Sequence, residues 1–177
     1  YDTQKMMCHY CGYEKKGEVF CPSCGSDKIR HIGMGTQKIE TEIEQKFPYA
    51  KIIRMDKDTT STKYAFDDIT HQFQNHEADI LIGTQMVVKG FDFPLVSVVG
   101  VILADMALNM PDIYSSFRAF CLAYQAAGRC GRKSGGGKVF IQTYSPEHYV
   151  IERVKEYDYE GFYKDEIRYR KKMSYPP

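Results

Sequence analysis

Residues 78–84 read ADILIGT and residues 96–105 read VSVVGVILAD, two runs dominated by Ile, Val and Leu. Continuous apolar runs of this length are typical of strands that are buried on both faces in a parallel sheet. Three more strand-like runs occupy residues 29–35, 51–55 and 137–144. Because helical patterns separate the runs, the sequence predicts an α/β fold in which helices cover both faces of a mostly parallel sheet.

Four stretches carry apolar residues at helical spacing, residues 36–47, 63–74, 115–129 and 146–157. We expect the last of these helices to open with a proline in its first turn. Ligands of parallel α/β sheets bind at the carboxyl ends of the strands. We therefore expect three glycine-containing pieces to lie at that edge: GMGTQ from residue 33, GTQMVVKGFDFP from residue 83 and QAAGRCGR from residue 125.

The 177 residues carry 24 basic and 23 acidic side chains, a formal net charge of +1. This balance gives no global attraction to nucleic acid or membrane, so any site for a polyanion must be local. No apolar run approaches the roughly 20 residues that span a membrane, and the start of the chain lacks the pattern of a signal peptide. We expect a cytoplasmic protein, and we interpret the sequence from Tyr1 to Pro177 as a fragment of a longer chain.

Four of the six cysteines form two C-x2-C pairs that nine residues separate, and a glycine follows each pair. A tight turn after the second thiol directs backbone amides at the sulfurs, and four thiolates complete a tetrahedral shell around zinc. The pattern thus predicts a small zinc-ribbon-like segment whose metal ligands are Cys8, Cys11, Cys21 and Cys24. The alternative is a pair of redox-active C-x2-C motifs, which favour a strand-to-helix context that this stretch lacks.

Residues 83–105 resemble motif V and the strand that follows it in the second lobe of superfamily 2 helicases, and QAAGRCGR resembles their motif VI. Together with CPSCG, RMDKDTT, IQTYSPEH and the YPP ending, these stretches are similar to the PriA family of primosomal replication-restart helicases. The resemblance covers residues 8–177. It implies a zinc-binding segment at 1–31, a RecA-like helicase lobe at 32–157, and a C-terminal helix with the start of a further region at 158–177.

The resemblance also implies a divided ATP site. The first lobe of such helicases supplies the P-loop and the Mg²⁺-binding acids, and Arg129 and Arg132 match the arginines that the second lobe supplies to the γ-phosphate. Further residues match the nucleotide site: Gln125, Gly128, Gly90 and Asp92. The alternative is that both arginines simply complement the dipole of a solvated helix end.

Residues for DNA follow from the same resemblance. Thr84, Gln85 and Lys89 match motif V positions that face the nucleic-acid backbone, where they would hold a strand without reading its sequence. Gly35 and Thr36 begin a helix whose free amides could seat a second phosphate, although Thr36 could equally be only an N-cap. The resemblance implies forked or junction DNA, primosome proteins and single-strand-binding proteins as partners.

The sequence has no match to the P-loop pattern, since GGGKV at residues 135–139 lacks the first glycine and the final Ser or Thr. We therefore expect the second motor lobe of an ATP-dependent DNA helicase, inactive without its partner lobe. Two alternatives stay open: the lobe of another superfamily 2 repair translocase, or a non-catalytic binding module. PriA proteins are implied to carry eight such cysteines for two zinc ions, so the pairing of the four present here stays open.

Overall fold

The computed structural model describes residues 5–7, 13–18, 20–27, 35–60, 63–88, 93–130 and 136–176. The chain forms two compact units, Tyr1–Gly33 and Met34–Pro177. Among the helices within these ranges, none is long and apolar enough to cross a membrane.

The first unit contains two short antiparallel strands, β1 (Lys5–Met7) and β2 (Glu14–Lys16), in a register that pairs Met7 with Glu14. A turn over CPSCG follows, in which the Gly25 amide donates to the Cys21 carbonyl at 2.8 Å. Gly25 has a φ of +68°. Because only glycine adopts this left-handed conformation without steric cost, the residue after the second thiol closes the turn.

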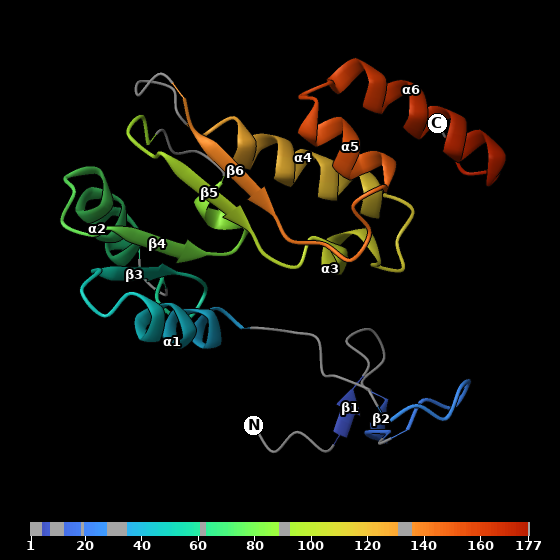
Figure 1. Cartoon of the computed structure of the whole chain (residues 1–177), viewed down its shortest axis with the longest axis horizontal. Helices are drawn as coiled ribbons and strands as arrows, with labels where there is room; N and C mark the ends of the chain where they lie inside the picture. Colours follow the sequence, from blue (N-terminus) through green and yellow to red (C-terminus); the bar gives the residue numbers. More distant parts are fainter. Residues whose placement is uncertain are drawn as a thin grey trace. The chain divides into compact units, whose positions relative to one another are not determined.

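The first half of the second unit is built on two parallel strands, β3 (Ile52–Met55) and β4 (Ile80–Gly83). Helices α1 (Thr36–Lys46) and α2 (Lys63–Gln74) pack against this pair (Figure 1). The register sets Met55 beside Gly83. A Cβ on Gly83 would lie 2.6 Å from the Met55 carbonyl oxygen, so the close approach of the two strands requires a glycine there.

The second half is built on another parallel pair, β5 (Val98–Val101) and β6 (Lys138–Ile141). The helices here are α3 (Asp105–Leu108), α4 (Ser115–Ala127), α5 (Tyr149–Lys155) and α6 (Tyr159–Lys172). Helix α4 contacts β5, α5 packs on α4, and α6 packs on α5 (Figure 1). The main core lies between these layers around Phe120, which is fully buried and stacks on Phe162 with ring centroids 3.8 Å apart.

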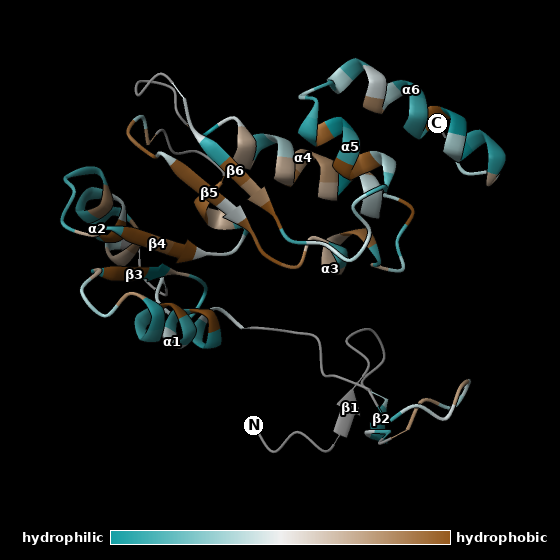
Figure 2. Cartoon of the chain, viewed as in Figure 1, coloured by the Kyte–Doolittle hydropathy of each residue, from teal (hydrophilic) through white to brown (hydrophobic). Residues whose placement is uncertain are grey.

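In the second unit the predicted alternation of strands and helices is confirmed, and the strands are parallel within the pairs β3–β4 and β5–β6. Figure 2 shows mostly hydrophobic residues along β3, β4 and β5, as the sequence pattern predicts. The structure differs from the prediction in that the described strands of the second unit form two separate pairs rather than one sheet. Coverage of both faces is also wrong for β5–β6, where Val98 and Phe140 share one face and remain 57% and 60% exposed.

Two element boundaries differ from expectation. Helix α5 begins at Tyr149 rather than at residue 146, because His148 caps it by accepting a hydrogen bond from the Val150 amide. Pro146 instead lies in the preceding turn. The short helix α3 was not predicted at all, since residues 96–105 were expected to be one long strand. Most of the strand predicted at 29–35 lies outside the described residues.

Candidate functional site

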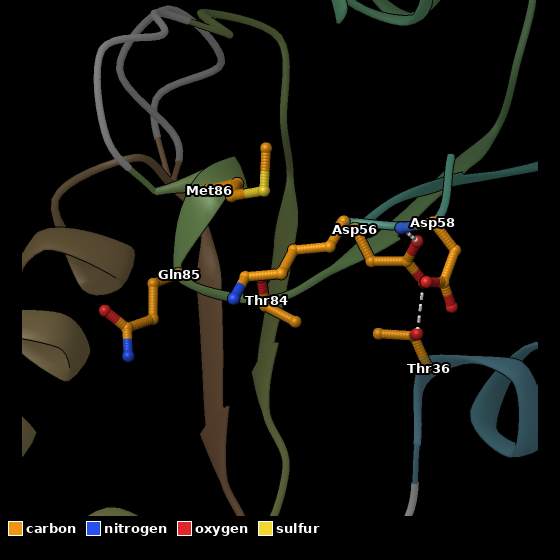
Figure 3. Close-up of a pocket in the computed structure, with 7 residues that line it drawn as sticks. Thr36, Asp56, Asp58, Thr84, Gln85 and Met86 are labelled. Atoms are coloured by element: carbon orange, nitrogen blue, oxygen red, sulfur yellow. Dashed lines mark hydrogen bonds between the residues drawn. The ribbon is translucent and has the colours of Figure 1, made fainter. Parts of the chain in front are cut away.

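A pocket of about 520 Å³ opens where β3 and β4 end (Figure 3). Its walls come from the start of α1, the loop after β3 and a 3-10 turn after β4, η1 (Gln85–Val87). The lining residues are Thr36, Asp56, Lys57, Asp58, Thr84, Gln85 and Met86. The pocket thus lies at the carboxyl ends of two adjacent parallel strands, the edge at which we expect a ligand.

Asp56 organises one wall of this pocket. Its Oδ1 accepts hydrogen bonds from the amides of Asp58 and Thr59, both at 3.0 Å, and its Oδ2 accepts one from the Thr36 hydroxyl at 2.5 Å. Arg54 Nε lies 2.8 Å from Oδ2 without a hydrogen bond between them, so this pair attracts through charge. The buried carboxylate therefore ties the loop after β3 to the first turn of α1.

The same contacts stabilise the charged form of Asp56. Burial alone raises the pKa of a carboxyl group, but the Thr36 hydroxyl, the Thr59 amide and the positive charge of Arg54 act in the opposite direction. Together they hold the pKa of Asp56 below its ordinary value. The carboxylate is thus ionised near neutral pH, while its neighbours Lys57 and Asp58 stay exposed at the rim.

The structure decides one alternative for Thr36. The N-cap of α1 is Gly35, and Thr36 is already the first helical residue. Its hydroxyl donates to Asp56 and not to the helix backbone, so the interpretation of Thr36 as an N-cap is wrong. The amides of Lys38 and Ile39 already donate to the Gly35 carbonyl, so the donors that the start of α1 can offer to an anion are the backbone amides of Gly35, Thr36 and Gln37.

Thr84 and Gln85 lie on the turn that follows β4, and both are exposed. Figure 3 shows Gln85 pointing away from Asp56, whereas Thr84 lies between them. Two of the residues expected to face nucleic acid are therefore brought to one rim, opposite the start of α1. Lys89, the third, lies outside the described residues.

The C-terminal end of α4 carries Gln125, Gly128 and Arg129. Gln125 is exposed, while Gly128 and Arg129 are half-buried. The Arg129 guanidinium donates a hydrogen bond through Nη2 to the carbonyl oxygen of Val88, at 3.2 Å. Within the described ranges Arg129 has no ion pair, so its charge is not neutralised by an acidic side chain there.

The position of this helix end differs from the prediction. Cys130 Sγ lies 3.2 Å from the Ser97 carbonyl oxygen and 3.4 Å from that of Lys138. Ser97 precedes β5 and Lys138 begins β6, so QAAGRC lies at the amino ends of these strands and not at their carboxyl ends. A hydrogen bond from Arg129 to the Val88 carbonyl joins this helix end to the turn after β4.

Several predicted residues fall outside the described part of the chain, namely Arg132, Gly90, Asp92, Cys8 and Cys11. Of the two cysteines that are described, Cys21 is half-buried and Cys24 is exposed. The backbone amides of Cys24 and Ser23 lower the pKa of the Cys21 thiol. Within the described ranges, no three His, Cys, Asp or Glu side chains come together to hold a metal ion.

Sequence reasoning missed two residues that shape these sites. Asp56 is not among the predicted site residues, although an Asp followed three and four residues later by Thr, as in DKDTT, is typical of a side chain that bonds its own backbone turn. Tyr157, which falls in the helix predicted at 146–157, is the other, and its hydroxyl lies against Gly128, the residue before Arg129. No local pattern indicates that second contact.

Comparison with known proteins identifies the family. Residues 5–134 match the family described as "Helicase conserved C-terminal domain". The chain is 48% identical over 174 residues to the replication restart protein PriA of Bacillus subtilis (strain 168), covering 98% of this chain and 22% of that protein.

Other relatives give the same result. Identity to the replication restart protein PriA is 43% over 172 residues in Synechocystis, covering 97% of this chain and 21% of that protein. It is 40% over 173 residues in Borreliella burgdorferi, covering 98% of this chain and 26% of that protein. The chain thus spans about a quarter or less of the length of these relatives. It belongs to the helicase conserved C-terminal domain family, and nearly all of its sequence is similar to replication restart proteins PriA.

Proposed function

We propose that this chain is the second, RecA-like motor lobe of an ATP-dependent DNA helicase that acts in replication restart. One observation carries the proposal: Arg129, at the end of α4, is joined to the turn after β4 through the Val88 carbonyl and has no acidic partner within the described ranges. An arginine held by a backbone oxygen keeps its full charge. That charge is what an incoming phosphate requires.

The chemistry assigned to the arginines is electrostatic. Negative charge develops on the transferred phosphoryl group as ATP is hydrolysed, and a guanidinium placed beside it lowers the barrier. Arg129 and Arg132 would supply this charge, with Gln125, Gly128, Gly90 and Asp92 around the nucleotide. The first lobe of the helicase would hold the P-loop and Mg²⁺. Because the chain has no P-loop sequence, we expect it to be inactive alone.

The pocket at the ends of β3 and β4 is proposed to hold the DNA backbone. Thr84 and Gln85 are exposed on one rim, and the first turn of α1, from Gly35 and Thr36, presents its amides on the other. Hydroxyl, amide and backbone N–H donors suit phosphate oxygens and do not distinguish bases. Lys89 would add a positive charge near the same turn. The pocket would therefore hold a DNA strand of any base sequence.

A structural zinc ion is proposed for the first unit, with Cys8, Cys11, Cys21 and Cys24 as its thiolate ligands. Support comes from the CPSCG turn, where Gly25 closes a tight loop and two amides favour the ionised form of Cys21. A thiolate, not a thiol, binds zinc. Such a short segment cannot build a core of its own, so the metal would supply its folding energy. By resemblance, the primosome and single-strand-binding proteins are the proposed protein partners.

The proposal is tested in a full-length helicase that carries this lobe, by ATP hydrolysis titrated with single-stranded DNA. Arg132→Ala is expected to lower the DNA-stimulated rate by about 10³-fold or more while DNA affinity is kept. Gln85→Ala should instead raise the DNA concentration that gives half-maximal stimulation. Arg118→Ala, an exposed arginine on α4, is the matched control. A wild-type rate in Arg132→Ala contradicts the proposal.

A further inference from the structure

The turn between α5 and α6 projects one residue onto the end of α4. Tyr157 in this turn has a φ of +55°, the left-handed conformation that is unfavourable for a bulky side chain. Its ring stacks on that of Tyr124 in α4, with centroids 4.1 Å apart and an interplanar angle of 13°. A strained backbone that persists in a structure requires surroundings that hold it in place.

Salt bridges hold this turn on both sides of Tyr157. Arg153 of α5 contacts Glu156 at 2.8 Å, Asp158 at 3.3 Å and Asp165 of α6 at 2.9 Å. Asp158 also caps α6, since its Oδ1 accepts a hydrogen bond from the Gly161 amide at 2.8 Å. The residues before and after Tyr157 are therefore fixed, and the direction of its ring follows from them.

The hydroxyl of Tyr157 lies where a side chain on Gly128 would begin. A Cβ at Gly128 would come 2.8 Å from this oxygen, whereas its next neighbours, the carbonyl oxygens of Gln125 and Tyr124, would be at an ordinary 3.5 Å. The Tyr157 hydroxyl is thus the group that a side chain at this position would have to displace. The φ of Gly128 is −67°, so its backbone conformation does not itself require glycine.

This contact sits one residue before Arg129. The last turn of α4 is closed by hydrogen bonds from the Gly128 amide to Tyr124 O at 3.0 Å and from the Arg129 amide to Ala126 O at 3.1 Å. The Tyr157 ring covers this turn from one side. The Arg129 side chain, which follows this turn, donates a hydrogen bond to the Val88 carbonyl oxygen.

We propose that Tyr157 is a positioning residue that fixes the end of α4 and thereby the place of Arg129 at the ATP site. The inference rests on the proposed role of Arg129. Tyr157 remains 53% exposed, so burial of its ring contributes less to the core than a buried aromatic would. Its effect is local: it sets the angle at which the arginine leaves the helix.

A double-mutant cycle in the full-length helicase isolates the contact. Gly128→Ala introduces the Cβ that meets the hydroxyl, and Tyr157→Phe removes that hydroxyl without removing the ring. Because a displacement of about 1 Å costs up to about 100-fold in rate, Gly128→Ala is expected to lower kcat by about 10- to 100-fold. The KM for ATP should stay within about twofold, because an interaction made only in the transition state is lost.

The rescue is the decisive part. Tyr157→Leu, which removes the ring stacked on Tyr124, should lower kcat about tenfold or more, Tyr157→Phe, which keeps that ring, should lower it less, and the double variant Gly128→Ala/Tyr157→Phe should recover most of the kcat lost in Gly128→Ala. Equal impairment of Gly128→Ala and the double variant, or a fully active Gly128→Ala, overturns the proposal. Tyr163→Phe, which removes a hydroxyl from an exposed tyrosine of α6, is the control and should change nothing.

Amide hydrogen exchange keeps this inference separate from the function on which it rests. In Gly128→Ala the Arg129 and Cys130 amides, which bond to Ala126 and Ala127, should exchange about tenfold faster or more, and the double variant should restore protection. Unchanged exchange overturns the positioning role. Restored exchange together with a fully active Arg129→Ala would instead reject the proposed function and retain the contact.

Discussion

The guanidinium of Arg129 and the carbonyl oxygen of Val88 are joined by a hydrogen bond of 3.2 Å, across 41 positions of sequence. Val88 follows the turn that presents Thr84 and Gln85 at the pocket rim. The segment proposed to hold DNA is therefore connected directly to the arginine proposed to act on ATP. This single contact offers a physical route by which DNA at the pocket could alter the position of the arginine.

Loss of the Asp56 charge should destabilise the loop after β3, which forms one wall of the pocket. Asp56→Asn keeps an oxygen for the loop amides but removes the attraction to Arg54, and we expect it to lower the free energy of unfolding by about 2 kcal/mol at pH 7. Urea unfolding of this chain measures the change. Asp67→Asn, at an exposed position of α2, is the control and should cost almost nothing.

The same variant has a pH signature. The folded pKa of Asp56 lies below its ordinary value of 3.8, so its stabilisation is complete above that value and is lost as the pH falls through the folded pKa. Wild type should therefore lose part of its stability below about pH 4 that Asp56→Asn never had. Parallel stability curves for the two proteins between pH 7 and pH 3 would show that Asp56 is not responsible.

A buried ion pair anchors α6. Arg170 Nε lies 2.7 Å from Glu166 Oε1, and only 7% of each side chain is exposed. The Tyr149 hydroxyl donates a hydrogen bond to Glu166 Oε2 at 2.6 Å. Glu166→Leu leaves the Arg170 charge buried without its partner, and we expect a loss of about 3–5 kcal/mol in the free energy of unfolding.

The double variant Glu166→Leu/Arg170→Met provides the comparison. It removes both charges, so it should be more stable than Glu166→Leu alone, although Arg170 also donates to the carbonyl oxygens of Pro176 and Ile113. Denaturant midpoints of the two variants decide the point. If the single variant is the more stable of the two, the carboxylate does not compensate the buried guanidinium.

His148 should make the stability of α5 depend on pH. Its Nδ1 accepts a hydrogen bond from the Val150 amide, with 3.3 Å between the two nitrogens. Only the neutral imidazole can accept this bond. Burial lowers the pKa of His148, and the charges of Asp105 and Glu166 oppose this without reversing it. The stabilisation is thus present above the ordinary value of 6.5 and is lost as the pH falls through the lower folded pKa.

His148→Asn tests this dependence, since asparagine caps helices at any pH. The thermal midpoint of wild type should fall between pH 7.5 and pH 5 by more than that of His148→Asn. His71→Asn, at an exposed position of α2, should follow wild type. An acid-dependent fall of the same size in His148→Asn would assign the effect to other groups.

Local patterns predicted much of the fold. The apolar runs at 51–55, 78–84 and 137–144 contain β3, β4 and β6, because a continuous Val/Ile/Leu run has few alternatives to a buried strand. The expected helices at 36–47, 63–74 and 115–129 match α1, α2 and α4 within two residues at each end. Amphipathic spacing alone suffices for elements of this length.

Contacts between distant segments were not predictable in the same way. The α4 end was expected at the carboxyl edge of the strands, but it contacts Ser97 and Lys138 at the amino edge. Motif resemblance leads us to propose a role for Arg129 but does not indicate where its helix packs. Likewise, the resemblance matches Gly128 to the nucleotide site but does not indicate that the Tyr157 hydroxyl lies against it. Such pairings depend on tertiary packing, which no window of sequence encodes.

The most direct test of the central claim is the DNA-stimulated rate of ATP hydrolysis in a full-length helicase that carries Arg129→Ala, compared with wild type and with Arg118→Ala. The account predicts a fall in kcat of about 10³-fold or more for Arg129→Ala, with DNA affinity preserved and Arg118→Ala unchanged. A wild-type kcat in Arg129→Ala would contradict it. The end of α4 would then be a structural helix terminus, and the chain would serve the helicase through binding rather than through its ATP site.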